Sequence, residues 1–132
     1  MKVAFICVHN SCRSQIAEAL AKSKRLNNIE FYSAGTSLKP INPKAIRYLK
    51  SEFNIDISKE KSKLIDSLAD IDYVITMGCN VECPSLKHNI ARYDFGIADP
   101  SDYSKKDFIK TIYEIDKKID EFLKNIGVLD EK

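Results

Sequence analysis

The feature that most constrains the fold is an apolar segment that runs directly into a short polar loop and then into a helical pattern. The apolar segment covers residues 2–7, the loop ends near residue 14, and helical spacing of apolar residues continues to about residue 24. A near-continuous apolar run of this length is typical of a strand buried on both faces of a parallel sheet. The sequence therefore predicts a buried strand, a tight loop and a helix N-terminus in direct succession.

The loop between this strand and helix is suited to hold a tetrahedral oxyanion. Backbone N–H groups in a tight turn and the helix dipole favour negative charge, and Arg13 adds a two-pronged donor. Such surroundings favour the thiolate of Cys7, which makes it a nucleophile. Asn10 suits a left-handed turn position, and the Ser14 hydroxyl is placed to hydrogen-bond the thiolate. The predicted oxyanion-binding loop consists of Val8, His9, Asn10, Ser11, Cys12 and Ser14.

Plainer interpretations exist for three loop residues. Most free cysteines are small buried hydrophobes, and this description suits Cys12 better than it suits Cys7. His9 is most simply a loop residue with no part in catalysis.

The rest of the chain alternates between strand and helix patterns. Strands are predicted at residues 2–7, 30–35, 73–77 and 90–94. Helices are predicted at residues 11–24, 42–53 and 108–126, with a short helical turn at 64–68. Asn42 is expected to cap a helix, Pro43 to begin it, and Gly127 to end the last one. The order predicts an α/β three-layer sandwich with a central four-stranded parallel sheet and helices on both faces, as a single catalytic domain over residues 1–132.

Charge and hydropathy exclude several classes of function. The net charge of +2 arises from 21 basic and 19 acidic residues that are interspersed, so no dedicated nucleic-acid surface is expected. The apolar runs are too short to cross a membrane, and the first residues do not have the pattern of a signal peptide. We expect a cytoplasmic monomer that binds neither nucleic acid nor membrane.

The four cysteines fall into two pairs, Cys7 with Cys12 and Cys79 with Cys83. Thiols of cytosolic proteins are most often catalytic, redox-active or metal-binding. Cys79 and Cys83 are within disulfide reach if their segment is helical or looped. A zinc site built from the four cysteines, with His88 nearby, is the competing interpretation. Zinc is disfavoured because knuckles usually have two residues between cysteines and because Arg13 would lie beside the metal, so neither a metal nor another cofactor is expected.

The Asp99-Pro100 pair follows the last predicted strand. In open parallel sheets ligands bind beyond the carboxyl ends of the strands, where the first loop also lies. A carboxyl group at this edge can protonate a departing oxygen, while the proline stiffens its backbone. Asp99 is therefore the candidate general acid, although Asp-Pro is also common in ordinary turns.

The motifs together resemble the low-molecular-weight protein tyrosine phosphatase superfamily, and more closely the thioredoxin-coupled arsenate reductases built on that fold. The matching segments include residues 7–15, Ala17-Glu18, Ser33-Ala34-Gly35, residues 42–46, Leu64-Ile65-Asp66 and Asp99-Pro100. The phosphatases usually have proline where this chain has Gln15. That difference and the Cys79–Cys83 pair favour the reductases.

The resemblance implies an enzyme of arsenical resistance that converts arsenate to arsenite. Cys7 attacks arsenate in the loop, Arg13 and the loop amides stabilise the transition state, and Asp99 protonates the leaving hydroxyl. Cys79 then attacks the Cys7 sulfur and expels arsenite. Cys83 attacks Cys79, which leaves a disulfide for thioredoxin or a similar dithiol protein to reduce. Phosphate or sulfate would bind in the loop as mimics, and the segment 79–89 would be mobile.

The resemblance also leaves an alternative and two departures. The alternative is a phosphatase that hydrolyses aryl phosphates through a phospho-enzyme on Cys7, with only Arg13 and Asp99 as further catalytic groups. The best-known reductase branch has six residues between its last two cysteines, whereas this chain has three. That branch also holds a potassium ion near the first loop. Here Lys63 stands at one ligand position, and we predict that its ammonium takes the place of the cation, beside Asn10 and Glu18.

Overall fold

The computed structural model describes residues 1–78 and 90–128, and within these ranges four strands form one parallel sheet in the order β2-β1-β3-β4. The strands are β1 (Lys2–Cys7), β2 (Glu30–Gly35), β3 (Tyr73–Thr76) and β4 (Ala91–Asp94). All three pairings are parallel. The predicted four-stranded parallel sheet is confirmed, and the prediction of a mobile segment at 79–89 lies outside the described residues.

Strand β1 lies in the interior of the sheet because both of its faces are apolar. Val3 and Phe5 face the larger hydrophobic core, and Ala4 and Ile6 face a smaller one on the other side. All four side chains have no exposed surface. Successive side chains of a strand point to opposite faces, so an unbroken apolar run is stable only where both faces are covered.

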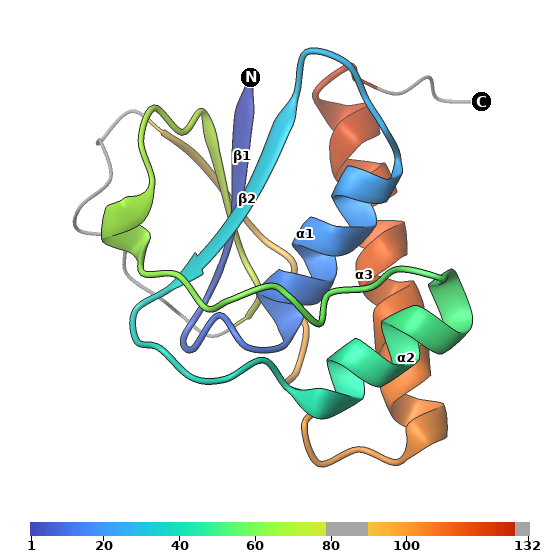
Figure 1. Cartoon of the computed structure of the whole chain (residues 1–132). Coiled ribbons are helices and arrows are strands. Elements are labelled where there is room, and N and C mark those ends of the chain that lie inside the picture. Colours follow the sequence, from blue (N-terminus) through green and yellow to red (C-terminus); the bar gives the residue numbers. More distant parts are fainter. Residues whose placement is uncertain (79–89, 129–132) are drawn as a thin grey trace.

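The larger core is covered by α1 (Arg13–Ser23), α2 (Pro43–Phe53) and α3 (Lys105–Asn125), which lie on one side of the sheet in Figure 1. The smaller core is closed by the short 3-10 helix η1 (Ile65–Ser67), on the opposite side. The predicted α/β three-layer arrangement is therefore confirmed. In the described part of the chain the helix on the second face is this single turn.

Local signals set several element ends where the sequence predicts them. Asn42 caps α2, and its Oδ1 accepts a hydrogen bond of 2.8 Å from the N–H of Lys44. Pro43 is the first residue of that helix. Gly127 follows the end of α3 with φ of +83°, the left-handed conformation that terminates helices.

Two helix starts differ from the prediction. Helix α1 begins at Arg13 rather than Ser11, since Cys12 has a non-helical backbone with φ of −138° and ψ of −87°. Helix α3 begins earlier than its apolar stripe, because the Ser104 hydroxyl accepts a hydrogen bond from the N–H of Asp107 and caps the helix there. Ser11 and Cys12 therefore belong to the loop.

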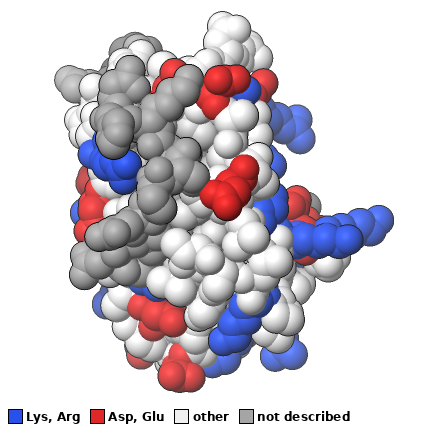
Figure 2. Space-filling view, turned by 90° about the vertical axis from the view of Figure 1, so that its left-hand side faces the viewer, with Lys and Arg blue, Asp and Glu red and all other residues white. Residues whose placement is uncertain are grey.

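On the face shown in Figure 2, Lys and Arg side chains are interspersed with Asp and Glu side chains, as the composition suggests. No helix in the described residues combines the length and apolar character needed to span a bilayer.

The inward face of α3 predicts where a substitution destabilises the fold. Ile112 is fully buried in the larger core, and replacing it with alanine should lower the free energy of unfolding by about 2–5 kcal/mol. Glu114, which is exposed on the same helix, provides the matched control. Glu114→Ala should change stability by no more than about 0.5 kcal/mol. Urea denaturation of both variants measures the difference, and equal losses would contradict this account of the core.

Candidate active site

The loop that follows β1 lies at the carboxyl edge of the sheet. Cys7 is the last residue of β1 and pairs in register with Gly35, the last residue of β2. Met77 follows β3 directly, and Asp99 comes five residues after the end of β4. The topology therefore brings Cys7, Met77 and the Asp99 segment to one edge, as the parallel arrangement requires.

The loop backbone packs directly against Gly35. A Cβ atom at Gly35 would lie 2.6 Å from the carbonyl oxygen of Val8 and 2.8 Å from the backbone N of Asn10. Contacts this short between non-bonded atoms are not tolerated, so only glycine fits at the end of β2. Asn10 itself has φ of +50°, which confirms its predicted left-handed conformation.

Backbone N–H groups of other segments hold the loop by donating hydrogen bonds to its carbonyl oxygens. The N–H groups of Thr36 and Ser37 both donate to Val8 O at 2.9 Å, and the N–H of Asn42 donates to Ser11 O at 2.7 Å. Helix α1 begins behind the loop without a side-chain cap. The N–H groups at the start of this helix are thus left for a ligand, and an anion is the ligand that a helix N-terminus favours.

A directed chain of hydrogen bonds ends on the sulfur of Cys7. The Oδ1 atom of Asn10 accepts from Gln15 Nε2 at 2.9 Å and from the Lys63 N–H at 2.8 Å, which fixes the orientation of its amide. Its Nδ2 therefore donates to Ser14 Oγ at 2.8 Å. Ser14 Oγ lies 2.8 Å from Cys7 Sγ, so the hydroxyl proton is directed at the sulfur. The buried sulfur therefore has a hydroxyl hydrogen-bond partner that is itself oriented by Asn10.

Arg13 is anchored at one end of its guanidinium group. Nη1 donates to the carbonyl oxygens of Met77 at 3.1 Å and Ile97 at 2.6 Å, which come after β3 and β4. A guanidinium carries five N–H donors, so donors remain on Nη2 and Nε for an oxyanion. The half-buried Arg13 is therefore held in position before any ligand arrives.

Asp99 is exposed at the same edge and is held by Ser101. Its Oδ1 accepts from the Ser101 N–H at 3.0 Å and from the Ser101 hydroxyl at 2.6 Å. Partial burial by its neighbours would by itself raise the pKa of the Asp99 carboxyl group. The two hydrogen bonds from Ser101 and the charges of Arg13 and Lys39 outweigh this effect and lower the pKa below its ordinary value. The carboxyl group is thus ionised at neutral pH when the site is empty.

Cys12 and His9 lie in the loop as predicted. The pKa of Cys12 is raised to about 12, chiefly by burial and further by the charges of Asp99 and Cys7, so this thiol stays neutral. The plainer interpretation of Cys12 as a buried packing residue is consistent with this environment. His9 is exposed, and its Nδ1 lies 2.8 Å from the Ser37 hydroxyl.

Glu18 is a buried carboxylate behind the loop. Its Oε1 accepts from the Ser33 hydroxyl at 2.5 Å and lies 3.5 Å from the Lys63 ammonium, while Oε2 lies 2.7 Å from Lys22 Nζ. Lys63 contacts Asn10 through its backbone N–H and not through its ammonium. Two lysines therefore offset the charge of Glu18, and Lys22 is the nearer one.

The remaining cysteines and His88 lie outside the described residues. The second half of the predicted site, Cys79 with Cys83, and the alternative zinc site that includes His88 both involve that segment. Among residues 1–78 and 90–128, no cluster of three His, Cys, Asp or Glu side chains could hold a metal ion.

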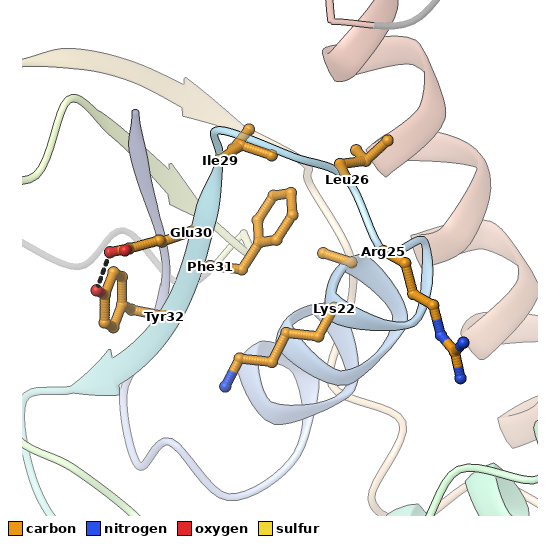
Figure 3. Close-up of a pocket in the computed structure, with 8 residues that line it drawn as sticks. Lys22, Arg25, Leu26, Ile29, Glu30, Phe31 and Tyr32 are labelled. Carbon is orange, nitrogen blue, oxygen red and sulfur yellow. Dashed lines mark hydrogen bonds between the residues drawn. The ribbon is translucent and has the colours of Figure 1, made fainter.

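A cavity of about 300 Å³ lies at the opposite edge of the sheet, between the end of α1 and the start of β2. Figure 3 shows the Phe31 ring directed from β2 toward α1 and the Tyr32 hydroxyl bonded to Glu30, with the Arg25 guanidinium directed away from Phe31. Glu30 pairs with Lys2 at the beginning of β1, whereas Cys7 ends that strand. This cavity is therefore separate from the loop site.

Several residues of the site were not predicted. The close contact of Gly35 is with the Cys7 loop, far away in the sequence, so its immediate neighbours carry no signal for that contact. Ser101 comes two residues after Asp99, a spacing typical of a side-chain turn at an aspartate, and could have been noticed. Lys22 is four residues after Glu18, a spacing that predicts an ion pair on one helix face and could have been noticed.

Comparison with known proteins agrees with this geometry. A model of the low molecular weight phosphotyrosine protein phosphatase family matches residues 2–131. The chain belongs to this family. It is therefore an enzyme of the low molecular weight phosphatase fold, as the loop motif indicates.

Members of the family that resemble this chain include arsenate reductases. Arsenate reductase 1 of Staphylococcus haemolyticus is 40% identical over 124 residues, which make up 91% of this chain and 92% of that protein. The solved structure of an arsenate reductase in the phosphate binding state has a TM-score of 0.82 and 31% identity, and the match covers 96% of this chain and 98% of that one. A thioredoxin-dependent arsenate reductase of Corynebacterium glutamicum has a TM-score of 0.73 and 36% identity, over 95% of this chain and 61% of that one.

The close contact at Gly35 predicts that a side chain at this position weakens anion binding. A Cβ at this position must displace the loop backbone, so Gly35→Ala should weaken phosphate binding about tenfold or more. Gly127→Ala is the control, because a Cβ there meets no atom within 4 Å and the cost is confined to its positive φ. Isothermal titration with inorganic phosphate compares the two variants. Wild-type affinity in Gly35→Ala would show that the loop does not depend on this contact.

Proposed function

We propose that this chain is an arsenate reductase that uses Cys7, Cys79 and Cys83 in turn and is regenerated by thioredoxin or a similar dithiol protein. The observation that supports it most is the site around Cys7, where a serine hydroxyl at 2.8 Å and an anchored arginine adjoin a loop suited to an oxyanion. Similarity to proteins named arsenate reductases supports arsenate as the oxyanion.

In the first step the Cys7 thiolate attacks arsenic. A sulfur–arsenic bond forms, one arsenic–oxygen bond breaks, and the oxygen leaves as water after it takes a proton from Asp99. Arg13 and the N–H groups of the loop would stabilise the negative charge on the remaining oxygens. Because Asp99 is ionised in the empty site, the proton must arrive with the bound oxyanion or from solvent. An anion in the loop raises the pKa of a nearby carboxyl group and so favours this transfer.

In the second step the Cys79 thiolate attacks the Cys7 sulfur. A Cys7–Cys79 disulfide forms, and the electron pair of the sulfur–arsenic bond passes to arsenic, which is released as arsenite. The Cys83 thiolate then attacks Cys79 and expels Cys7 as a thiolate. Two electrons from the dithiol protein reduce the resulting Cys79–Cys83 disulfide. The thioredoxin-dependent relative supports this choice of reductant.

The second candidate function is hydrolysis of aryl phosphates. Family membership favours it, since the matching family is one of phosphotyrosine phosphatases. Water, in place of Cys79, would release the phosphoryl group from Cys7. Arg13 and Asp99 would be the only other catalytic side chains needed. Arsenate-dependent oxidation of NADPH with thioredoxin and thioredoxin reductase, run beside an aryl phosphatase assay, separates the two functions.

The cysteines divide the two activities. Cys7→Ser should reduce both arsenate reduction and aryl phosphate hydrolysis to background, because it removes the nucleophile. Cys79→Ser and Cys83→Ser should abolish multiple turnover with arsenate and leave aryl phosphate hydrolysis within about twofold of the wild type. If Cys79→Ser and Cys83→Ser both still turn over arsenate, the relay is wrong.

We also propose that the Lys63 ammonium supplies the positive charge beside Glu18 that a bound potassium ion would otherwise supply. Activity should then be equal in potassium and sodium chloride. Lys63→Ala should lose no more than about 1 kcal/mol of stability, because Lys22 still faces Glu18, and its activity should become potassium-dependent. Lys61→Ala, an exposed neighbour, is the control. Potassium dependence of the wild type, or a cation bound beside Glu18, would refute the proposal.

A further inference from the structure

Ser101 lies between the residue that caps α2 and the candidate general acid. Asn42 Nδ2 donates to Ser101 Oγ at 3.4 Å, and Ser101 Oγ donates to Asp99 Oδ1 at 2.6 Å. The Ser101 N–H donates to the same carboxyl oxygen at 3.0 Å. Within residues 1–78 and 90–128, the hydrogen bonds made to the Asp99 carboxyl group all end on Oδ1.

The backbone around Ser101 is fixed by the same helix. Lys44 Nζ donates to the carbonyl oxygen of Ser101 at 2.9 Å and to that of Tyr103 at 3.0 Å. Asn42 also donates its backbone N–H to Ser11 in the oxyanion-binding loop at 2.7 Å. The start of α2 therefore holds the Asp99 segment and the Cys7 loop in one arrangement.

A serine hydroxyl has one proton, and the chain of bonds determines where it goes. Asn42 donates to Ser101 Oγ, so the Ser101 proton is not needed for that bond. Ser101 also contacts the Cys12 thiol, but that thiol is neutral, and the ionised Asp99 at 2.6 Å is the stronger acceptor. An oxygen that accepts two donors is a poor position for a further proton. The other carboxyl oxygen, Oδ2, is thus left to carry it.

We propose that Ser101 is a positioning residue for the proton transfer: by donating twice to Oδ1 of Asp99, it reserves Oδ2 as the oxygen that carries the proton to the leaving group. The proposal rests on the proposed function because it takes Asp99 as the general acid. It applies equally to the departing oxygen of arsenate and to that of an aryl phosphate.

Ser101 also affects the pH range in which Asp99 carries a proton. Arg13 from α1 and Lys39 from the loop before α2 face Asp99 and favour its ionised form, as does Ser101. Cys12, the titratable group of the loop on this side, remains a neutral thiol. Without the Ser101 hydroxyl the ionised form loses a charge-assisted bond, so the pKa of Asp99 must rise. A general acid is active only when protonated, so the high-pH limb of the activity profile must move upward as well.

The test compares Ser101→Ala with Ser101→Thr, which keeps the hydroxyl, and with Ser104→Ala. Ser104 caps α3 through Asp107 and has no bond to Asp99, so its variant controls for general loosening of this segment. Carbon-13 NMR of the Asp99 carboxyl group gives its titration midpoint without reference to activity. The pH dependence of kcat/KM for an aryl phosphate gives the functional limb.

In Ser101→Ala we expect the Asp99 midpoint and the descending limb to move to higher pH together. At a pH on that limb, the activity of Ser101→Ala as a fraction of its own plateau should be about tenfold higher than the same fraction for the wild type. This is the change expected from the loss of one charge-assisted hydrogen bond worth about 1.4 kcal/mol. Ser101→Thr should restore both midpoints, and Ser104→Ala should leave them unchanged.

An unchanged Asp99 midpoint in Ser101→Ala overturns the proposal, and so does a lower rate with no movement of either midpoint. If the NMR midpoint moves while the limb does not, Asp99 is not the proton donor, and its assigned role fails together with this proposal. If both move in a protein that does not reduce arsenate, the reductase function fails and the role of Ser101 stands.

Discussion

The backbone of the Cys7 loop lies against Gly35 so closely that no side chain fits between them. This contact is possible only because β1 and β2 end level with each other, with Cys7 opposite Gly35 in the parallel register. That register in turn depends on an apolar β1 buried on both faces. The shape of the anion-binding loop therefore depends on burial of the sheet, and the chemistry of the site depends on the hydrophobic packing of β1.

The two reactive groups of the proposed mechanism are served by similar arrangements of small polar residues. On one side Asn10 orients Ser14, which bonds the Cys7 sulfur. On the other side Asn42 contacts Ser101, which bonds Asp99. In each case an amide donates to a hydroxyl, and the hydroxyl contacts the reactive group. Such chains are effective because every member is satisfied and because their bonds polarise one another.

The sequence predicts those parts of the fold that are determined locally. The buried strand, the Asn42 cap and the stop at Gly127 each follow from a few adjacent residues, and the structure confirms them. The start of α1 was misplaced because Cys12 provides no capping side chain that would reveal it. The site roles of Gly35 and Lys39 are not predicted because they arise from residues far away in the sequence. Ser101 is only two residues from Asp99, so its bond to that carboxyl group had a local signal. Cys79 and Cys83 rest on spacing and resemblance, and they stay predictions.

Arg13 binds two carbonyl groups as well as facing the anion site. Met77 and Ile97, which provide them, follow different strands, so the guanidinium acts as a cross-link between β3 and the segment after β4. A lysine there would keep the charge but lose the planar fork that binds both carbonyl groups and leaves further donors for an anion. The inactivity of an Arg13 variant would therefore not by itself establish a role in transition-state stabilisation. Only a variant whose sheet edge is shown to be intact could separate the electrostatic contribution of this residue from its architectural one.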